Sequence, residues 1–275
     1  MKKLIFLLPV VLLLLTGCAK ENTGTVVAAT TKPVAQFTSA LLEGTDKQVA
    51  CVVTESVSCL HDHSLTVKQM KLLEQADLII LSGGGTEDFM LDALKGKTHV
   101  LDCSKAVSYR EGDPHYWLDP LRARDMARAI ATELTRRYPE NADKIAENLL
   151  TLEGEFSSLI SYGENATSSL SCRELVTFHD GFSYLAESFD LSILASMEEE
   201  HGSEVSAKDL EAIISLVKGH KLPAIFTEVN GATVAARTVS GETGVKVFAL
   251  DMAMGERDYF SAMRYNIDII KEALA

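Results

Sequence analysis

The sequence is short of positive charge, and this shortage limits its partners. It has 26 lysines and arginines against 39 aspartates and glutamates, which gives a formal net charge of -13 at pH 7. Nucleic-acid backbones attract basic surfaces, so a chain this acidic is a poor candidate for binding DNA or RNA. An acidic surface mildly favours cations, although many secreted proteins share this property.

Two motifs that would indicate enzymatic or phosphate chemistry are also missing. No H-E-x-x-H segment occurs, which argues against a zinc hydrolase of that type. Gly83-Gly84-Gly85 follows an expected strand, but it lacks the lysine of a P-loop and the G-x-G-x-x-G spacing. Glu87 and Asp88 would also repel a phosphate. We interpret the glycines as a turn and expect no enzyme activity.

Only one long apolar run is present, and it lies at the N-terminus. Lys2 and Lys3 precede Leu4–Leu15, which is shorter than the roughly 20 residues that a membrane-spanning helix needs. With Leu15-Thr16-Gly17-Cys18 at its end, this segment resembles a bacterial lipoprotein signal. The resemblance implies cleavage before Cys18, acylation of Cys18, and anchoring of the protein to the extracytoplasmic face of the membrane.

The rest of the chain alternates between strand-like and helix-like segments. Eight short β-branched or apolar runs are expected strands: Thr25–Thr30, Gln48–Thr54, Asp77–Ser82, Thr98–Asp102, Glu174–Phe178, Leu191–Met197, Ala224–Val229 and Val245–Leu250. Segments with helical periodicity separate them, including Glu87–Lys95, and the segment Glu256–Leu274 is the expected closing helix. Two groups of four strands argue for an α/β protein of two lobes, each with a four-stranded parallel sheet flanked by helices.

The longest helical stretch, Asn141–Asn165, lies between the two groups of strands and is typical of a rigid connector. Accordingly we divide the chain into a signal peptide, a tether, an N-terminal lobe, a connector helix and a C-terminal lobe. The signal peptide comprises residues 1–17, the tether 18–24, the N-terminal lobe 25–138, the connector helix 139–168 and the C-terminal lobe 169–275.

Metal-competent side chains follow four of the expected strands. His61 and His115 lie in the loops after the second and fourth strands, while His179 and Asp251 directly follow the fifth and eighth. Ligands of open parallel sheets bind beyond the carboxyl ends of the strands. If the lobes face each other, these four side chains converge. Three imidazoles and one carboxylate can fill a four-coordinate zinc site.

Five segments are similar to those of the zinc- and manganese-binding proteins of bacterial ABC importers. They are L-H-D-H-S-L-T from Leu60, D-P-H-Y-W-L-D-P from Asp113, F-H-D-G-F from Phe178, I-F-T-E from Ile225 and A-L-D from Ala249. The resemblance extends in order from about Thr25 to the C-terminus. It implies two lobes joined by one long helix, with the metal between the lobes.

The same resemblance implies four metal ligands: His61, His115, His179 and Asp251. It also implies that the protein captures zinc for a membrane permease and its ATPase and catalyses no reaction. His179 and the imidazole-rich set favour zinc, while oxygen-rich sites suit manganese. Manganese or iron remains an alternative cargo, and a surface adhesin or a zinc hydrolase remains an alternative function. We expect a monomer.

Several other side chains are candidates for supporting roles. Glu228 is a fifth ligand or an outer partner of a ligand, and we favour the second interpretation. Asp62 and Asp180 are candidate acceptors for the outer N–H of a metal-bound imidazole, although Asp180 could equally cap a helix. His63 has two interpretations, an accessory ligand or a surface loop residue. His201 is either part of a weak zinc collector or part of a solvated acidic loop.

The cysteines leave the disulfide pattern open. Four remain after Cys18: Cys51, Cys59, Cys103 and Cys172. In an oxidising compartment they allow up to two disulfides with three connectivities. Cys59 also lies close to His61 in the sequence and is an alternative metal contact.

Overall fold

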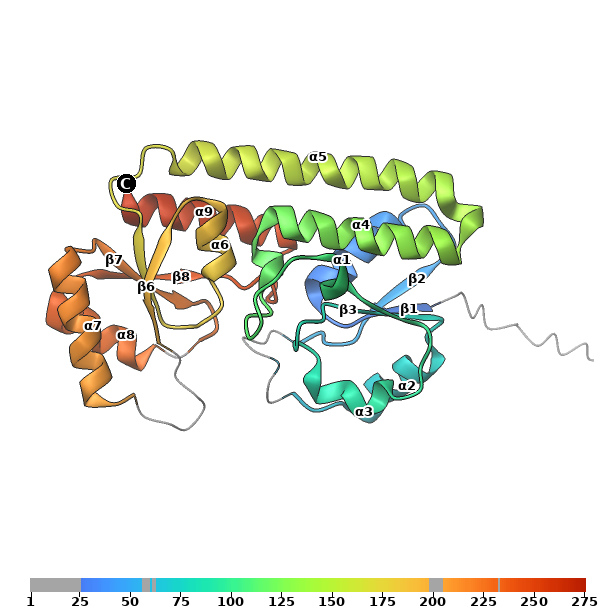
Figure 1. Cartoon of the computed structure of the whole chain (residues 1–275), viewed down its shortest axis with the longest axis horizontal. Coiled ribbons are helices and arrows are strands. Elements are labelled where there is room, and N and C mark those ends of the chain that lie inside the picture. The colour runs from blue at the N-terminus through green and yellow to red at the C-terminus, as the bar shows by residue number, and fades with distance from the viewer. Residues whose placement is uncertain (1–25, 56–59, 61–62, 198–204, 232) are drawn as a thin grey trace, which may run out of the picture.

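The structure, a computed structural model, describes residues 26–55, 60, 63–197, 205–231 and 233–275 (Figure 1). The predictions for Cys18, Cys59, His61, Asp62 and His201 therefore lie outside the described residues. So do the predicted signal peptide and tether. None of the helices within the described ranges is long and apolar enough to cross a membrane.

The N-terminal lobe contains a four-stranded parallel sheet in the order β2-β1-β3-β4. Its strands are β1 (Val26–Ala29), β2 (Gln48–Cys51), β3 (Leu78–Leu81) and β4 (Val100–Asp102). Helices α1 (Lys32–Leu41), α2 (Val67–Gln75) and α3 (Leu91–Leu94) lie between them. Short 3-10 turns cover Asp88–Met90, Cys103–Ala106 and Tyr116–Leu118. All four residues of β3 are buried, as expected for a strand covered on both faces.

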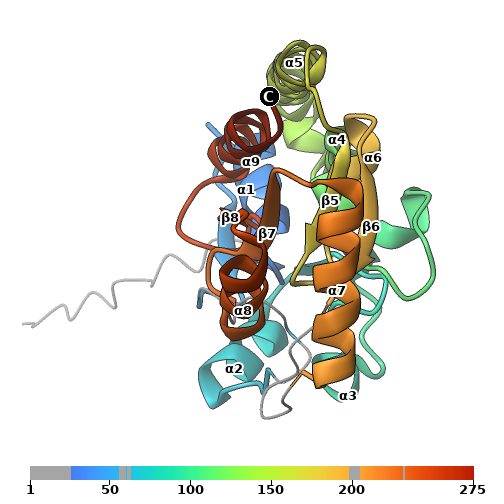
Figure 2. The same cartoon turned by 90° about the vertical axis from the view of Figure 1, so that its left-hand side faces the viewer.

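The C-terminal lobe repeats this arrangement with a parallel sheet in the order β6-β5-β7-β8. Its strands are β5 (Glu174–Thr177), β6 (Ser192–Ser196), β7 (Ala224–Glu228) and β8 (Lys246–Leu250). Helices α6 (Ser183–Ser188), α7 (Ala207–His220) and α8 (Val234–Thr243) complete the lobe. Figure 2 shows α7 and α8 on the outer side of this sheet. The predicted α/β class with two four-stranded parallel sheets is confirmed.

Three long helices hold the lobes together: α4 (Pro120–Arg137), α5 (Ala142–Thr167) and α9 (Tyr259–Leu274). A 3-10 turn at Pro139–Asn141 separates α4 from α5. Helix α5 is the predicted connector, and it runs along the length of the molecule over both lobes (Figure 1). It packs on α1 and α4 of the N-terminal lobe and on α9 of the C-terminal lobe.

The helix ends follow local sequence signals. Thr66 and Gln69 form a reciprocal capping box at the start of α2. Asp119 caps α4 through the Leu121 N–H at 2.8 Å, with Pro120 at the first helical position. The closing helix begins at Tyr259 and not at Glu256 as predicted, because the Asp258 side chain caps it.

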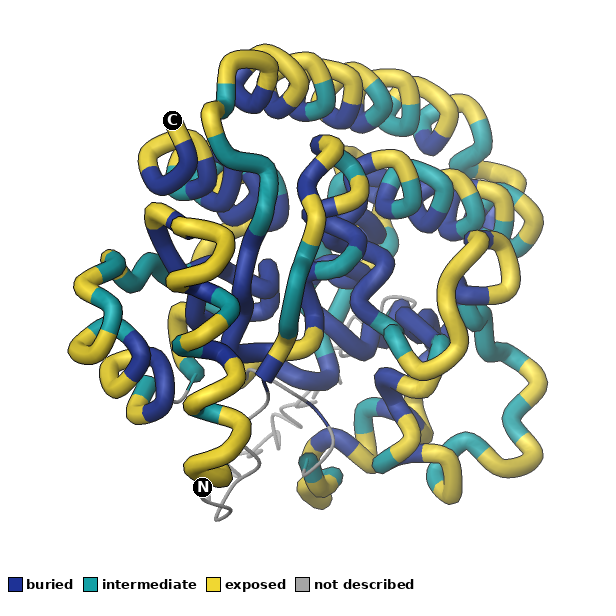
Figure 3. Tube along the Cα trace, turned by 60° about the vertical axis from the view of Figure 1, so that its left-hand side comes forward, coloured by how far each residue is buried: buried dark blue, intermediate teal, exposed yellow. Residues whose placement is uncertain are grey.

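The predicted helix Glu87–Lys95 is also different in the structure. It is a 3-10 turn at Asp88–Met90 followed by the four-residue helix α3. The Glu87 side chain, which would have begun the helix on its surface, turns inward and is buried. The buried residues form a layer beneath α4, α5 and α9 and within both sheets (Figure 3).

Candidate metal centre

His115 lies in the loop between β4 and α4, at the carboxyl edge of the N-terminal sheet. Its side chain is buried, and its Nδ1 lies 3.0 Å from Oδ1 of Asp113. The same oxygen accepts a hydrogen bond from the His115 backbone N–H at 3.1 Å. The Trp117 ring packs edge-on against the imidazole with 5.4 Å between centroids. The carboxylate therefore fixes the ring, and Nε2 is the nitrogen that points away from Asp113.

His179 follows β5, at the carboxyl edge of the C-terminal sheet. It is 7% exposed, and its Nδ1 lies 3.7 Å from Oε2 of Glu228, which is 4% exposed. Glu228 is the last residue of the neighbouring strand β7, so adjacent parallel strands bring the two side chains together. The distance is within ion-pair range but longer than a hydrogen bond.

The two imidazoles come from opposite lobes and pack edge to face. Their ring centroids are 5.6 Å apart and their planes meet at 76°. Gly181 leaves room on one side of the His179 ring, because a Cβ there would lie 2.9 Å from Nε2 and 2.7 Å from Cε of Met252. Met252 belongs to the loop after β8, so the segment next to Asp251 also borders the histidine pair.

Asp251 is buried at the end of β8, and its backbone and side chain are both held. Asn266 of α9 accepts the Asp251 N–H at 2.7 Å and donates to its carbonyl at 2.8 Å. The carboxylate Oδ1 accepts the Ala253 N–H at 2.9 Å, and Oδ2 accepts from the Arg257 guanidinium at 2.9 Å.

The structure thus pairs His115 with His179 and places the Asp251 loop beside them. Within the described part of the chain, it does not gather three histidine, cysteine or carboxylate side chains closely enough to hold a metal ion. Asp251 is turned toward Arg257, and His61 lies outside the described residues.

Comparison with known proteins decides the family. Residues 27–273 match the family described as the zinc-uptake complex component A, periplasmic. The chain belongs to this family. The resemblance inferred from the five sequence segments is confirmed.

Individual relatives of the chain are distant in sequence. A zinc-binding protein, AdcA, of Streptococcus pyogenes is 27% identical over 76% of the chain, which spans 42% of that relative. The high-affinity zinc uptake protein ZnuA of Bacillus subtilis is 25% identical over 90% of the chain and 87% of its own length. The chain therefore spans less than half of the streptococcal relative.

Solved structures share the fold. The laminin-binding protein Lmb of Streptococcus agalactiae, described as an adhesin with metal-transporting activity, superposes with a TM-score of 0.82. The match covers 92% of this chain and all of that one at 24% sequence identity. Because the sequence identity is below 25%, this likeness shows the fold of the chain and does not identify the ligand that the chain binds.

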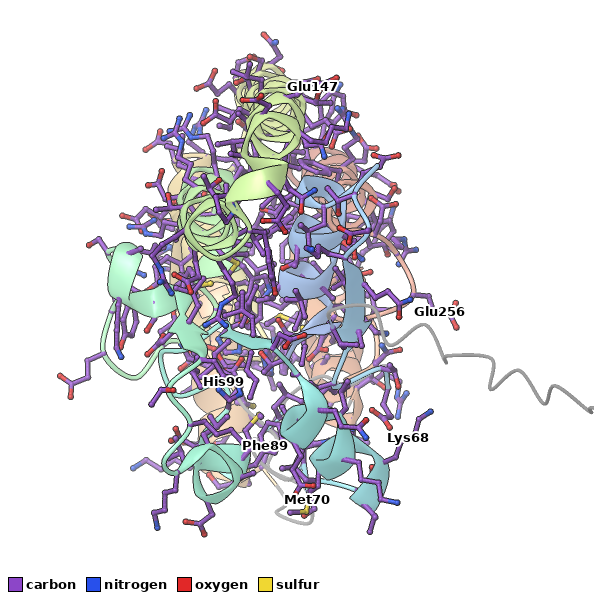
Figure 4. The ribbon with its side chains drawn as sticks, turned by 90° about the vertical axis from the view of Figure 1, so that its right-hand side faces the viewer. Lys68, Met70, Phe89, His99, Glu147 and Glu256 are labelled. Atoms are coloured by element: carbon purple, nitrogen blue, oxygen red, sulfur yellow. The ribbon has the colours of Figure 1, made fainter. Side chains whose placement is uncertain are left out.

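His63 and Asp180 are two further candidates for supporting roles, and both lie in the described part of the chain. The His63 ring packs edge-on against Phe89 at 4.9 Å, and its Nε2 lies 3.4 Å from Nε2 of Gln69. Phe89 lies at the end of the N-terminal lobe that carries α2 and α3 (Figure 4). Asp180 is exposed and does not cap α6, whose N-cap position is Phe182 without a side-chain cap bond.

The described cysteines form no disulfide. Cys51, Cys103 and Cys172 are all free, and Cys59, the fourth cysteine whose pairing the sequence left open, lies outside the described residues. Cys103 is fully buried among apolar groups, and burial raises its pKa well above the ordinary value. It is a core residue in this family member.

Sequence reasoning missed a clamp between the lobes close to His115. It consists of Arg110, Arg122, Tyr184 and Glu187. The Tyr184 hydroxyl oxygen accepts the Arg110 backbone N–H, and Arg110 Nη2 lies 2.7 Å from Oε2 of Glu187. Both guanidinium groups lie over the Tyr184 ring, at 5.0 and 4.8 Å. These contacts link residues far apart in the sequence, so no local pattern could have indicated them.

Asp113 was also missed as the partner of His115. A local signal existed, because Asp113 stands two residues before His115 in the D-P-H-Y-W-L-D-P segment. Its short side chain can fold back onto both the backbone and the ring of His115.

The three glycines after β3 form a turn, as predicted, around a buried carboxyl group. Gly83, Gly84 and Gly85 all have positive φ, at 80°, 67° and 98°. Glu87 accepts the backbone N–H groups of Ser82 at 2.7 Å and Gly83 at 2.8 Å. Burial raises the pKa of Glu87 to about 7, against the opposing effect of these hydrogen bonds.

Proposed function

We propose that this chain is an extracytoplasmic solute-binding protein that captures zinc between its two lobes and delivers it to an ABC permease. The observation that carries this proposal is the pair of buried imidazoles, His115 and His179, contributed by opposite lobes. Each has Nδ1 facing a carboxylate oxygen, of Asp113 and Glu228 respectively. Metal-bound histidines commonly present their outer nitrogen to a carboxylate in this way, which leaves Nε2 for the metal.

The proposed ligand set is His61, His115, His179 and Asp251. Asp251 contributes its carboxylate from the loop that borders the histidine pair, and His61 completes the set. Glu228 then acts on His179 and not on the metal, since its carboxylate faces Nδ1. A set with four protein ligands leaves no coordination position for a catalytic water, so the chain binds its cargo without reacting with it.

Zinc is the proposed cargo because the site is rich in imidazole. Borderline-soft zinc accepts three nitrogen ligands and one oxygen ligand in a tetrahedral site, whereas manganese prefers sites dominated by oxygen. Membership of the zinc-uptake family agrees with this assignment. Manganese is the competing cargo in the test below.

The remaining features follow from delivery to a membrane partner. Acylation of Cys18 would anchor the protein by lipid to the outer face of the cell membrane, with residues 18–24 as a tether. Residues 25–138 and 169–275 would form the lobes and 139–168 the connector helix. The protein would act as a monomer, and an ATPase on the opposite side of the membrane would drive uptake.

The test is metal binding by purified protein that has been stripped with a chelator. Equimolar zinc and manganese are offered, and the bound metal is measured by mass spectrometry with the melting temperature alongside. We expect one zinc per chain and a raised melting temperature, because a ligand that binds the folded state stabilises it. Alanine substitutions of His61, His115, His179 and Asp251 should each weaken zinc binding.

A matched control is available in His220. This histidine also faces a carboxylate, since its Nδ1 lies 2.9 Å from Oε2 of Glu174, but its side chain is 43% exposed on α7. His220→Ala should leave zinc binding unchanged. Preferential retention of manganese would overturn the choice of metal, and absence of tight binding by either metal would overturn the proposed function.

A further inference from the structure

The proposed ligand Asp251 has a charged competitor within the same loop. Its two carboxylate oxygens have different partners: Oδ1 accepts the Ala253 N–H, and Oδ2 accepts from Arg257 Nη1, both at 2.9 Å. The first partner is a backbone group two residues away, and Ala253 is fully buried. The second is a flexible side chain. Oδ2 of Asp251 is therefore the oxygen that a zinc ion could approach once the Arg257 side chain moves.

Arg257 is placed so that it can move. It lies in the segment between β8 and α9, and its side chain is 41% exposed. Its guanidinium lies 4.0 Å from the centroid of the Tyr265 ring, which supports it against Asp251. The neighbouring Glu256 points away from the ribbon toward solvent (Figure 4). If the Arg257 guanidinium leaves Asp251, it can therefore move into solvent.

The rest of the segment is held in place. Lys32 Nζ donates to the Gly255 carbonyl at 2.7 Å, and the Tyr259 N–H donates to Oε1 of Gln36 at 2.6 Å. Both anchors belong to α1, so the backbone on either side of Arg257 is fixed to the opposite lobe. Displacement of Arg257 then needs only its side chain to rotate.

We infer that Arg257 is a built-in competitor of the metal cargo for Asp251, and that it weakens zinc binding and eases zinc release. The inference rests on the proposed function, in which Asp251 is a ligand. Arginine stays charged at every physiological pH, so its cation always opposes a metal ion at Oδ2. Zinc entering the site must displace the guanidinium or tolerate it nearby. Conversely, the returning guanidinium stabilises the carboxylate as zinc leaves.

The test compares zinc affinity and zinc release among variants of the full protein. Arg257→Met removes the charge and keeps a similar length. We expect it to bind zinc about tenfold or more tightly in competition with a chromogenic chelator, because it removes a nearby like charge. Zinc release to excess chelator in a stopped-flow instrument should slow in parallel. Arg257→Lys, which keeps the charge, should stay closer to the wild type.

Arg264→Met is the matched control. Arg264 is on α9, lies over the Tyr162 ring at 5.0 Å and bonds the Ser158 hydroxyl at 3.2 Å. This substitution changes the net charge by the same amount and also removes an arginine that lies over a tyrosine ring. Because Arg264 does not contact Asp251, zinc affinity should stay near the wild-type value.

Tyr265→Leu provides a second variant that keeps the net charge. It removes the ring under the guanidinium, which should loosen the pair with Asp251 and move zinc affinity in the same direction as Arg257→Met. Equal or weaker zinc binding by both Arg257→Met and Tyr265→Leu, with circular dichroism like the wild type, would overturn the inference. That result is distinct from failure of the proposed function, in which the wild-type protein itself would not retain zinc.

Discussion

The indole nitrogen of Trp117 donates a hydrogen bond to the backbone carbonyl of Met252 at 2.9 Å. Tyr259 in turn donates its hydroxyl hydrogen to the Trp117 carbonyl at 2.8 Å. The loop that carries His115 is thereby bonded to the loop that carries Asp251, although the loops belong to different lobes. Both bonds are buried, so they hold the two halves of the candidate site in register.

Trp117 should report metal binding directly. It is the only tryptophan in the sequence, and its ring lies 5.4 Å from the His115 imidazole. We expect zinc titration to change the intrinsic fluorescence, with saturation at one equivalent. His115→Ala should abolish the change, whereas His220→Ala should preserve it. Unchanged emission while calorimetry detects zinc binding would contradict the placement of the metal beside His115.

The Tyr184 hydroxyl should control the order of the His115 loop. Tyr184→Phe leaves the Arg110 N–H without its acceptor but retains the ring under both guanidinium groups. We expect a loss of about 1–2 kcal/mol in the free energy of unfolding and faster amide exchange around Arg110. Tyr162→Phe is the control, because Tyr162 also bonds a partner and lies under an arginine, but far from this loop. Equal exchange in both variants would argue against the clamp.

Glu87 should make stability depend on pH. Its pKa rises from 4.5 to about 7 on folding because the carboxyl is buried. Between these values the folded chain keeps a proton that the unfolded chain has lost, so stability falls as pH rises. Relative to Glu87→Gln, the wild type should lose about 3 kcal/mol between pH 4.5 and pH 8. Urea unfolding at each pH measures this difference, and parallel curves for the two proteins would refute it.

Two glycines of α5 should respond to alanine in opposite ways. A Cβ at Gly163 would overlap the Phe189 ring, whereas a Cβ at Gly154 would meet no atom within 4 Å. Gly154→Ala should raise the free energy of unfolding by about 0.5–1 kcal/mol, since alanine favours a helix. Gly163→Ala should lower it by about 1–3 kcal/mol, because the ring must move in a packed interior. Denaturant unfolding of both variants checks the prediction, and stabilisation by Gly163→Ala would contradict the close packing of α5 on the C-terminal lobe.

The sequence by itself determined the order of the strands and long helices and the class of fold. Strand and helix periods are local properties of the chain, and caps such as Asp119-Pro120 depend on adjacent residues. Because parallel strands end at the same edge, it also indicated that His115 and His179 would lie at the edges where ligands bind. The predicted start of the closing helix, Glu256, lies N-terminal to the true start, because the helical periodicity continues on the N-terminal side of the Asp258 cap.

Only the tertiary structure decided which side chains support that site. Glu228 faces Nδ1 of His179 because β5 and β7 are neighbours in the sheet, and the sequence had left its role open. Free cysteines and the pair between Arg257 and Asp251 likewise depend on the final path of the backbone. Burial of Glu87 is also a product of packing. Sequence patterns determine what each segment forms, while contacts between distant segments determine the charge and hydrogen bonding around each ligand.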